Sequence, residues 1–254
     1  MKDLRLEIDG GVATLVIDRP QARNALARQT MRELDDALGS IHETGARVLV
    51  IRGAGERAFC AGGDLKELEN IRSEAGAADM AREMRTTLDR IPQLRIPVIA
   101  ALNGDAFGGG AELAVACDFR VAARHARIGF AQISLGLMPA WGASERLAAL
   151  VGRGHALYML FTGEVMSAAK ARKLGLVEAV CPTESFDDAL RNLAQTIATA
   201  PEAALAGIKA SVNAVRPHHN PEFADDTIAA FAKTWADPAH WDAVEKMERQ
   251  RRKK

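Results

Sequence analysis

The order of apolar and polar positions predicts alternating strands and helices over the first half of the chain. Apolar runs rich in β-branched residues occur at Val12–Asp18, Arg47–Gly55 and Ile96–Gly104. Between the first two runs, apolar residues recur at helical spacing over residues 27–38, and Gly39 follows them. This stretch is predicted to be an amphipathic helix that ends at the glycine.

The alternation continues with a polar helical stretch over residues 77–90, a short strand at Phe119–Ala123 and a further strand within residues 126–132. Nearly continuous apolar strands that alternate with helices indicate a mainly parallel sheet covered on both faces. From about Ser144 onward the strand signal almost disappears. Helical patterns broken by prolines follow, so we expect a C-terminal helical region packed on an α/β core.

Composition excludes several classes of function. The 254 residues suit one large domain, and 33 basic residues balance 33 acidic ones. With zero net charge, general attraction to nucleic acid or to an anionic membrane is not expected, and no run reaches the roughly 18 apolar residues of a membrane span. Three scattered cysteines and a start without an apolar leader favour a reduced, cytoplasmic protein with neither disulfides nor a metal site.

Two glycine-rich corners carry the candidate chemistry. FCAGGDL (59–65) follows the second predicted strand, and NGDAFGGGAEL (103–113) follows the third. Glycine allows close backbone approach, and the first turn of a helix has free N–H donors. Either corner alone is equally typical of helix packing, but together they would aim two N–H groups at one oxygen, which is the design of an oxyanion hole. A dinucleotide G-x-G-x-x-G motif fails because Leu113 occupies its last position.

These two corners, with RPQARNAL upstream (19–26), resemble the enoyl-CoA hydratase/isomerase family, also called the crotonase superfamily. The resemblance runs in the correct order from about Leu15 to Val180. It implies a ββα superhelical α/β core over residues 1–195 and a C-terminal helical trimerisation region over residues 196–254. It also implies a homotrimer or homohexamer that acts on an acyl-CoA thioester, with coenzyme A as part of the substrate and no separate cofactor.

The resemblance also implies roles for particular residues. The N–H groups of Gly63 and Gly109 would form the oxyanion hole. The CoA-binding residues would be Arg23, Ala61, Gly63, Asp64, Leu65, Lys66 and Gly109. Glu112, just inside the helix that the second corner opens, would be the catalytic acid/base, although such a position also suits an ordinary N-terminal helix acid.

The loop GFAQISLGLMP (129–139) departs from the hydratases of this family, which have a second glutamate where this chain has Gln132. An amide cannot transfer a proton at neutral pH, but it can position a water or a substrate carboxylate. We therefore expect a hydratase-like lyase and keep open a malonyl-type decarboxylase, an enoyl-CoA isomerase and an impaired CoA-binding protein. The segment LMPAWGASERL (137–147) resembles ethylmalonyl-CoA decarboxylases, while Trp141 equally suits a packing role.

Other polar residues are interpreted as structural. Asp64 and Asp105 are expected to cap turns, and Asp118 to hold a turn or to contact Arg120. Lys209 is interpreted as a solvated lysine on a helix. The six histidines lack the spacing of a triad or metal site, and the pair His218–His219 is expected in a solvated turn.

Overall fold

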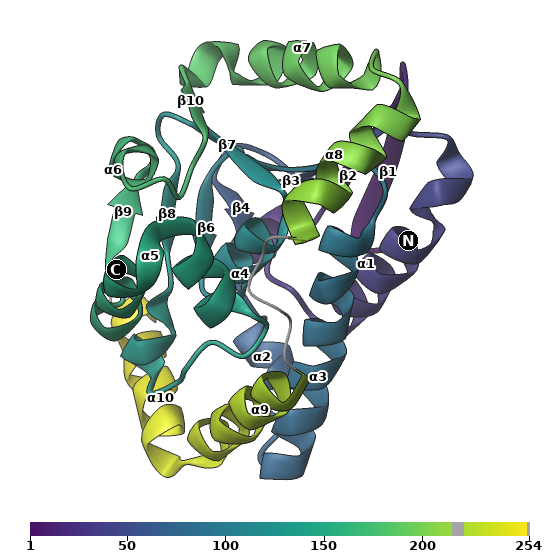
Figure 1. Cartoon of the computed structure of the whole chain (residues 1–254). Helices are drawn as coiled ribbons and strands as arrows, with labels where there is room; N and C mark the ends of the chain where they lie inside the picture. The colour runs from purple at the N-terminus through teal and green to yellow at the C-terminus, as the bar shows by residue number, and fades with distance from the viewer. Residues whose placement is uncertain (215–220, 253–254) are drawn as a thin grey trace.

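The computed structural model describes residues 1–214 and 221–252 and contains two sheets surrounded by helices (Figure 1). The larger sheet has the strand order β1-β2-β3-β5-β7-β10. Its strands are β1 Leu4–Asp9, β2 Val12–Ile17, β3 Val48–Gly53, β5 Val98–Leu102, β7 Phe119–Ala123 and β10 Ala179–Cys181. Among the described strands of this sheet, only β1 and β2 pair antiparallel, so the prediction of a mainly parallel sheet is confirmed.

A second sheet of short strands lies beside the first. Its order is β4-β6-β8-β9, with β4 Ala58–Cys60, β6 Asp105–Phe107, β8 Arg127–Gly129 and β9 Val165–Ser167. A long strand, a short strand and a helix follow one another in β3–β4–α2 (α2, Leu65–Leu68) and again in β5–β6–α4 (α4, Gly109–Ala116). The chain therefore winds as repeated ββα turns, and this α/β architecture agrees with the predicted fold class.

Several short elements did not appear in the sequence pattern. The edge strand β1 is largely exposed and alternates charged with apolar residues, whereas β4, β6, β9 and β10 have three residues each. Two of these strands, β9 and β10, lie beyond Ser144, where the strand signal almost disappears, because three residues are too few to establish a period of two. Helix α1 (Arg28–Ser40) also continues through Gly39, and the chain turns only at Gly45, whose φ is +68°.

Two buried amides hold the turns that lead from one sheet to the other. Asn103 accepts a hydrogen bond from Gly53 N–H (3.0 Å) and donates one to Gly53 C=O (2.9 Å). Asn24 donates to Ala58 C=O (2.7 Å). A Cβ on Gly53 would lie 2.5 Å from Asn24 Nδ2, so only glycine fits this crossing. The turns bring the ends of β4 and β6 to the same side of the molecule.

Helices cover both faces of the large sheet. The main apolar core includes α1, α3 (Glu74–Arg90) and α4, and a smaller cluster lies between the other face and α7 (Phe186–Ala198). In Figure 1, α7 crosses the top of the sheet. The boundary that the resemblance implied between residues 195 and 196 falls inside α7.

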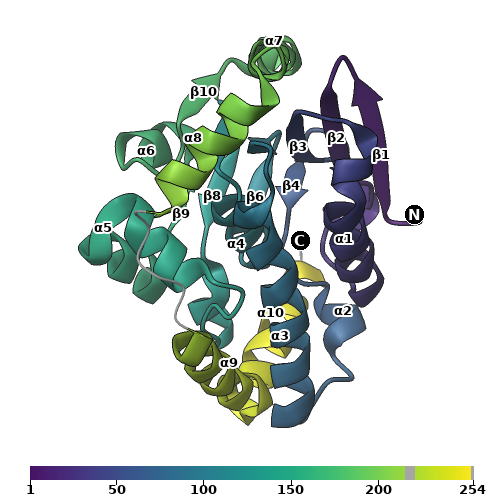
Figure 2. The ribbon, with the colours of Figure 1, turned by 45° about the vertical axis from the view of Figure 1, so that its right-hand side comes forward.

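The last three helices are α8 (Glu202–Ala214), α9 (Pro221–Ala236) and α10 (Pro238–Arg252). Prolines begin both α9 and α10, as expected for the first helical position. Two views place α9 beside α3 (Figure 1, Figure 2). No helix within the described ranges is long and apolar enough to cross a membrane. His218 and His219 lie outside the described residues.

The interpretation of Lys209 as a solvated residue was wrong. Its side chain is 8% exposed and its ammonium pairs with Asp118 (2.7 Å). It also donates to the carbonyls of Ile91 and Ile96, each at 2.9 Å. Asp118 accepts in addition from Val98 N–H (2.8 Å), so its partner is Lys209, while Arg120 pairs with Glu178. This buried ion pair fastens α8 to the start of β5.

Candidate active site

The two glycine corners meet at the edge of the second sheet. A Cβ on Gly62, whose φ is +100°, would lie 3.0 Å from Phe107 O and 3.2 Å from Gly109 N. This approach needs glycine both for its conformation and for its lack of a side chain. The corners are 46 positions apart in sequence when counted from Gly63 to Gly109, yet their backbones touch.

Neither candidate oxyanion donor, the N–H of Gly63 or that of Gly109, is used in the backbone hydrogen bonding of the segment or helix next to it. Leu26 N–H donates to Gly62 C=O (2.8 Å), and Asp64 N–H donates to Leu26 C=O (3.0 Å). Because N–H groups alternate in direction along an extended chain, Gly63 N–H points away from Leu26. Gly109 is the first residue of α4, where an N–H has no acceptor within the helix. Gly63 and Gly109 line the same cavity.

This cavity has a volume of about 520 Å³. It is lined by all of the residues to which the sequence assigned a role, namely Arg23, Ala61, Gly63, Asp64, Leu65, Lys66, Gly109, Glu112 and Gln132. Arg23 and Lys66 are exposed and carry positive charge at its edge. The carboxylate of Asp64 is already paired with Arg19 (2.9 Å), so its side chain holds the corner together. It makes no side-chain cap at the start of α2, where a turn cap was expected.

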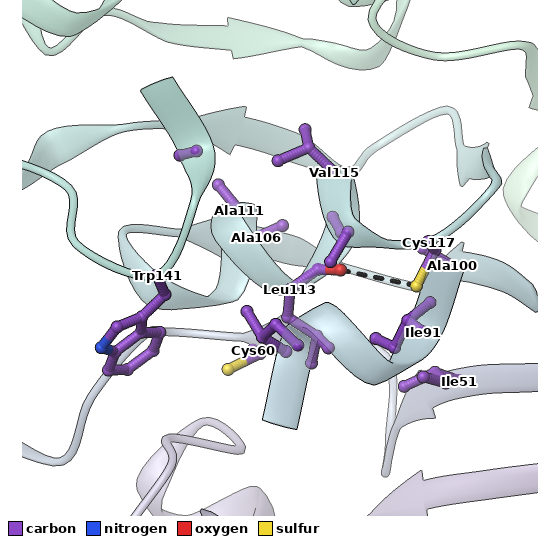
Figure 3. Packing of buried hydrophobic residues seen from close by; sticks show 14 of the residues in the cluster. Ile51, Cys60, Ile91, Ala100, Ala106, Ala111, Leu113, Val115, Cys117 and Trp141 are labelled. Atoms are coloured by element: carbon purple, nitrogen blue, oxygen red, sulfur yellow. Dashed lines mark hydrogen bonds between the residues drawn. The ribbon is translucent and has the colours of Figure 1, made fainter. Parts of the chain in front are cut away.

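Helix α4 is apolar apart from one charged residue, Glu112. All eight residues of α4 are buried. Its side chains Ala111, Leu113 and Val115 belong to one buried cluster with Ala106 and Trp141 (Figure 3). Burial of a carboxylate in such a helix is costly unless donors satisfy it.

Glu112 has three donors. Its Oε2 accepts hydrogen bonds from Trp141 N–H (2.8 Å) and Ala143 N–H (3.2 Å), and its Oε1 accepts one from Gln132 Nε2 (2.9 Å). Burial raises the pKa of Glu112 from its ordinary 4.5 to about 7, although these hydrogen bonds and the charge of Arg146 act in the opposite direction. A carboxyl group with a pKa near 7 can both accept and return a proton at neutral pH.

Gln132 lies at the start of the short helix η4 (Ala131–Leu135), beside the cavity. While its amide N–H is used on Glu112, its Oε1 is buried and has no partner among the described residues. The structure therefore brings Glu112 and Gln132 together, as the family resemblance implied. The free acceptor is available to a water or a substrate donor at this point of the cavity.

Trp141 forms the wall next to the glycine corners. A Cβ on Gly109 would come within 2.7 Å of Cη2 of its indole ring, and a Cβ on Gly63 would lie 3.8 Å from the same atom. The indole is 6% exposed and also lines the cavity. Trp141 is thus a packing residue, as one interpretation of the sequence expected, and it also lines the cavity.

Some site residues were missed from sequence. Phe231 and Trp235 of α9 line the cavity together with Leu68 and Met80, so the C-terminal helices complete the apolar end of the site. The apolar spacing of residues 228, 231 and 235 predicts a buried helix face, but it does not reveal what that face covers. Arg146 lies in the segment LMPAWGASERL, but the sequence assigned it no role. No three His, Cys, Asp or Glu side chains gather as a metal-binding group in the ranges described.

Comparison with known proteins agrees with this geometry. A sequence model of the enoyl-CoA hydratase/isomerase family matches residues 7–248, so the chain belongs to that family. Among its relatives, a crotonyl-CoA hydratase of Syntrophomonas wolfei is 36% identical over 213 residues, which are 84% of this chain and 82% of that protein. A short-chain-enoyl-CoA hydratase of Clostridium acetobutylicum is 36% identical over 205 residues, 80% of this chain and 78% of the relative.

Solved structures show the same fold. An enoyl-CoA hydratase from Bacillus anthracis superposes with a TM-score of 0.81 at 31% identity and covers 98% of this chain and 96% of its own. An enoyl-CoA hydratase from Mycobacterium avium subsp. paratuberculosis superposes with a TM-score of 0.88 at 27% identity, over 96% and 98% of the two chains. The fold class that the family resemblance implied is therefore confirmed.

Proposed function

We propose that this protein is an enoyl-CoA hydratase-like lyase, which adds water across the α,β double bond of an acyl-CoA thioester. One observation carries the proposal: a buried carboxyl group with a pKa near 7, Glu112, lines the same cavity as two free backbone N–H groups. The family and the hydratase names of its relatives support the same reaction.

The two N–H groups act on the thioester carbonyl. Gly63 and Gly109 donate hydrogen bonds to its oxygen, which draws electron density away from the conjugated double bond and makes the β-carbon electrophilic. Negative charge develops on that oxygen as the enolate forms. Each well-placed donor of this kind is worth about 3–4 kcal/mol of transition-state stabilisation.

Glu112 handles the proton. As a carboxylate it takes a proton from the water whose oxygen bonds to the β-carbon. Now neutral, it returns that proton to the α-carbon of the enolate, so the product has gained one water and Glu112 is ionised again. A single carboxyl group completes the cycle because a pKa near 7 leaves both of its forms populated at neutral pH. Gln132 orients Glu112 through its amide N–H and can accept a hydrogen bond from the same water through Oε1.

Coenzyme A enters as part of the substrate. Arg23 and Lys66 lie at the edge of the cavity, where their charges suit phosphate groups. Ala61, Asp64 and Leu65 contribute to the wall between that edge and Gly63. The acyl group would extend toward Met80, Phe231 and Trp235.

Mass spectrometry of the products tests this function directly. We expect crotonyl-CoA to gain one water, and Glu112→Gln to lose at least about 100-fold in kcat because it lacks the acid/base. Gln132→Glu is expected to retain or increase hydration activity.

If crotonyl-CoA stays unchanged while methyl- or ethylmalonyl-CoA loses carbon dioxide, the decarboxylase alternative is correct. A shift of the double bond leaves the mass unchanged and is followed by ¹H NMR of the same mixtures; such a shift without gain of water would indicate an isomerase. Binding of CoA without turnover of any thioester would indicate a binding protein.

A homotrimer or homohexamer is also part of the proposal. Exposed apolar side chains gather where the end of α5 (Ala143–Thr162) meets η4 and β9, namely Ile133, Tyr158, Phe161 and Val165. An apolar surface of this kind is typical of a contact between subunits. Sedimentation equilibrium is expected to give a mass of three or six chains.

A further inference from the structure

The turn Trp141–Ala143 supplies two of the three donors to Glu112, and Arg146 holds this turn. Trp141 N–H and Ala143 N–H both bind Glu112 Oε2. The carbonyl between them, that of Trp141, accepts a hydrogen bond from Arg146 Nη1 (2.6 Å). Gly142 has φ +99°, and a Cβ there would collide with the guanidinium, so the Arg146 side chain lies directly against the turn.

Arg146 is in turn held by α3. Its guanidinium pairs with Asp89, and Asp89 also pairs with Arg85 (2.8 Å). Arg85 pairs with Glu145 of α5 (2.5 Å). These four charged groups sum to zero and connect α3 with α5 immediately behind the turn. A chain of contacts therefore runs from Asp89 through Arg146 to the backbone that holds Glu112.

We propose that Arg146 is a positioning residue for catalysis, because it fixes the turn that presents two N–H groups to Glu112 and places a buried positive charge behind that turn. The inference rests on the proposed role of Glu112 as the acid/base. Arg146 does not line the cavity, so it acts through Glu112 and not on the substrate.

The charge has a definite direction of effect. The polar groups around Glu112 are the two N–H groups of the turn, Gln132 from η4 and Arg146 from α5, with the acidic groups of Asp89 and Glu145 and the cation of Arg85 behind Arg146. Arg146 favours the ionised form of Glu112. Loss of Arg146 is therefore expected to raise the pKa of Glu112, and loss of Asp89, which offsets the charge of Arg146, is expected to lower it.

The test follows the titration of Glu112 by ¹³C NMR of glutamate carboxyl groups, with the Glu112 signal identified by its absence in Glu112→Gln. In Arg146→Met we expect the midpoint to rise by about one pH unit. In Asp89→Asn the midpoint is expected to fall. In Arg153→Met, an exposed position of α5 beyond its kink at Gly152, it is expected to stay unchanged. An unchanged midpoint in Arg146→Met, or a rise in Asp89→Asn, would overturn the proposal.

Enzyme kinetics at several pH values provide a second test of this proposal. For Arg146→Met we expect roughly a tenfold lower kcat at neutral pH, a rising limb of kcat displaced to higher pH, and a nearly unchanged KM. A purely structural role of Arg146 would lower kcat without displacing the rising limb of kcat along the pH axis, and that result would also contradict the proposal. If Arg146→Met does not fold, Asp89→Asn and Arg146→Lys carry the test. Arg146→Lys keeps the positive charge, so we expect it to lower kcat while displacing the rising limb of the pH profile of kcat only slightly. The NMR titration needs no turnover, so it decides this inference even if the proposed reaction is wrong.

Discussion

The substitution Glu112→Gln is expected to stabilise the folded protein at neutral and alkaline pH and not at acidic pH. Glu112 is buried, and its pKa is about 7 in the folded protein against 4.5 for an ordinary glutamate. The folded state therefore binds this proton more tightly than the unfolded state. The favourable contribution is complete below pH 4.5 and is lost as the pH rises to 7, where the ionised form must be kept in the interior.

The magnitude follows from the two pKa values. A rise from 4.5 to about 7 corresponds to about 3 kcal/mol of unfolding free energy that the wild type loses between about pH 4 and about pH 8. Glutamine has no such cost, and its amide oxygen can still accept from the turn. Its NH₂ group can donate to Gln132 Oε1 after rotation of the Gln132 amide, because this oxygen is now unpartnered. The difference in unfolding free energy, variant minus wild type, should therefore grow by about 3 kcal/mol over this pH range.

The assay is urea unfolding of both proteins, followed by circular dichroism at several pH values and one protein concentration. The other titrating groups are the same in the variant and the wild type, so their contributions cancel in the difference in unfolding free energy. Glu33→Gln is the matched control: burial opposes ionisation of Glu33, but hydrogen bonds from Gln29 and from the amides of residues 2–4 outweigh it and lower its pKa. The difference in unfolding free energy between Glu33→Gln and wild type should change in the opposite direction, so that this variant becomes more destabilised as the pH rises. A difference for Glu112→Gln that stays flat with pH would refute the reasoning.

Two further substitutions test the site and the core. In Gly109→Ala, a Cβ would collide with the indole of Trp141, so we expect at least a tenfold loss of kcat from displacement of the oxyanion donor, measured against Gly154→Ala, where a Cβ meets nothing. Equal kcat in the two variants would contradict the role of Gly109 N–H. In Lys209→Met, Asp118, whose side chain is only 17% exposed, is left without its ion pair, so thermal unfolding should show a loss of about 3–5 kcal/mol, and the double variant with Asp118→Asn should recover part of it. No recovery would mean that the carbonyl contacts of Lys209, and not its charge, hold α8.

The charged network behind the turn joins two properties of this protein. The same contacts that fasten α3 to α5 also hold the backbone N–H groups that satisfy Glu112. Substitutions in this network are expected to affect stability and proton transfer together, because residues that share partners do not act independently.

The sequence by itself determined the long strands, most of the first helices and the two glycine corners, with Glu112 in the helix that the second corner opens. Apolar periodicity reports how each segment faces a core, and glycines at strand ends report close backbone approach, so both are local signals. The assignment of Gly63, Gly109, Glu112 and Gln132 to one site needed the family resemblance as well, because neither corner alone distinguishes catalysis from packing.

Only the tertiary structure decided which partners these residues have. The N–H groups that hold Glu112 come from residues 141–143, about thirty positions downstream, and the apolar end of the cavity comes from α9. Lys209 looks like a surface residue in the sequence and is buried on Asp118. The pKa of a carboxyl group and the burial of a lysine depend on contacts summed over segments far apart in the chain, and no local pattern contains that sum.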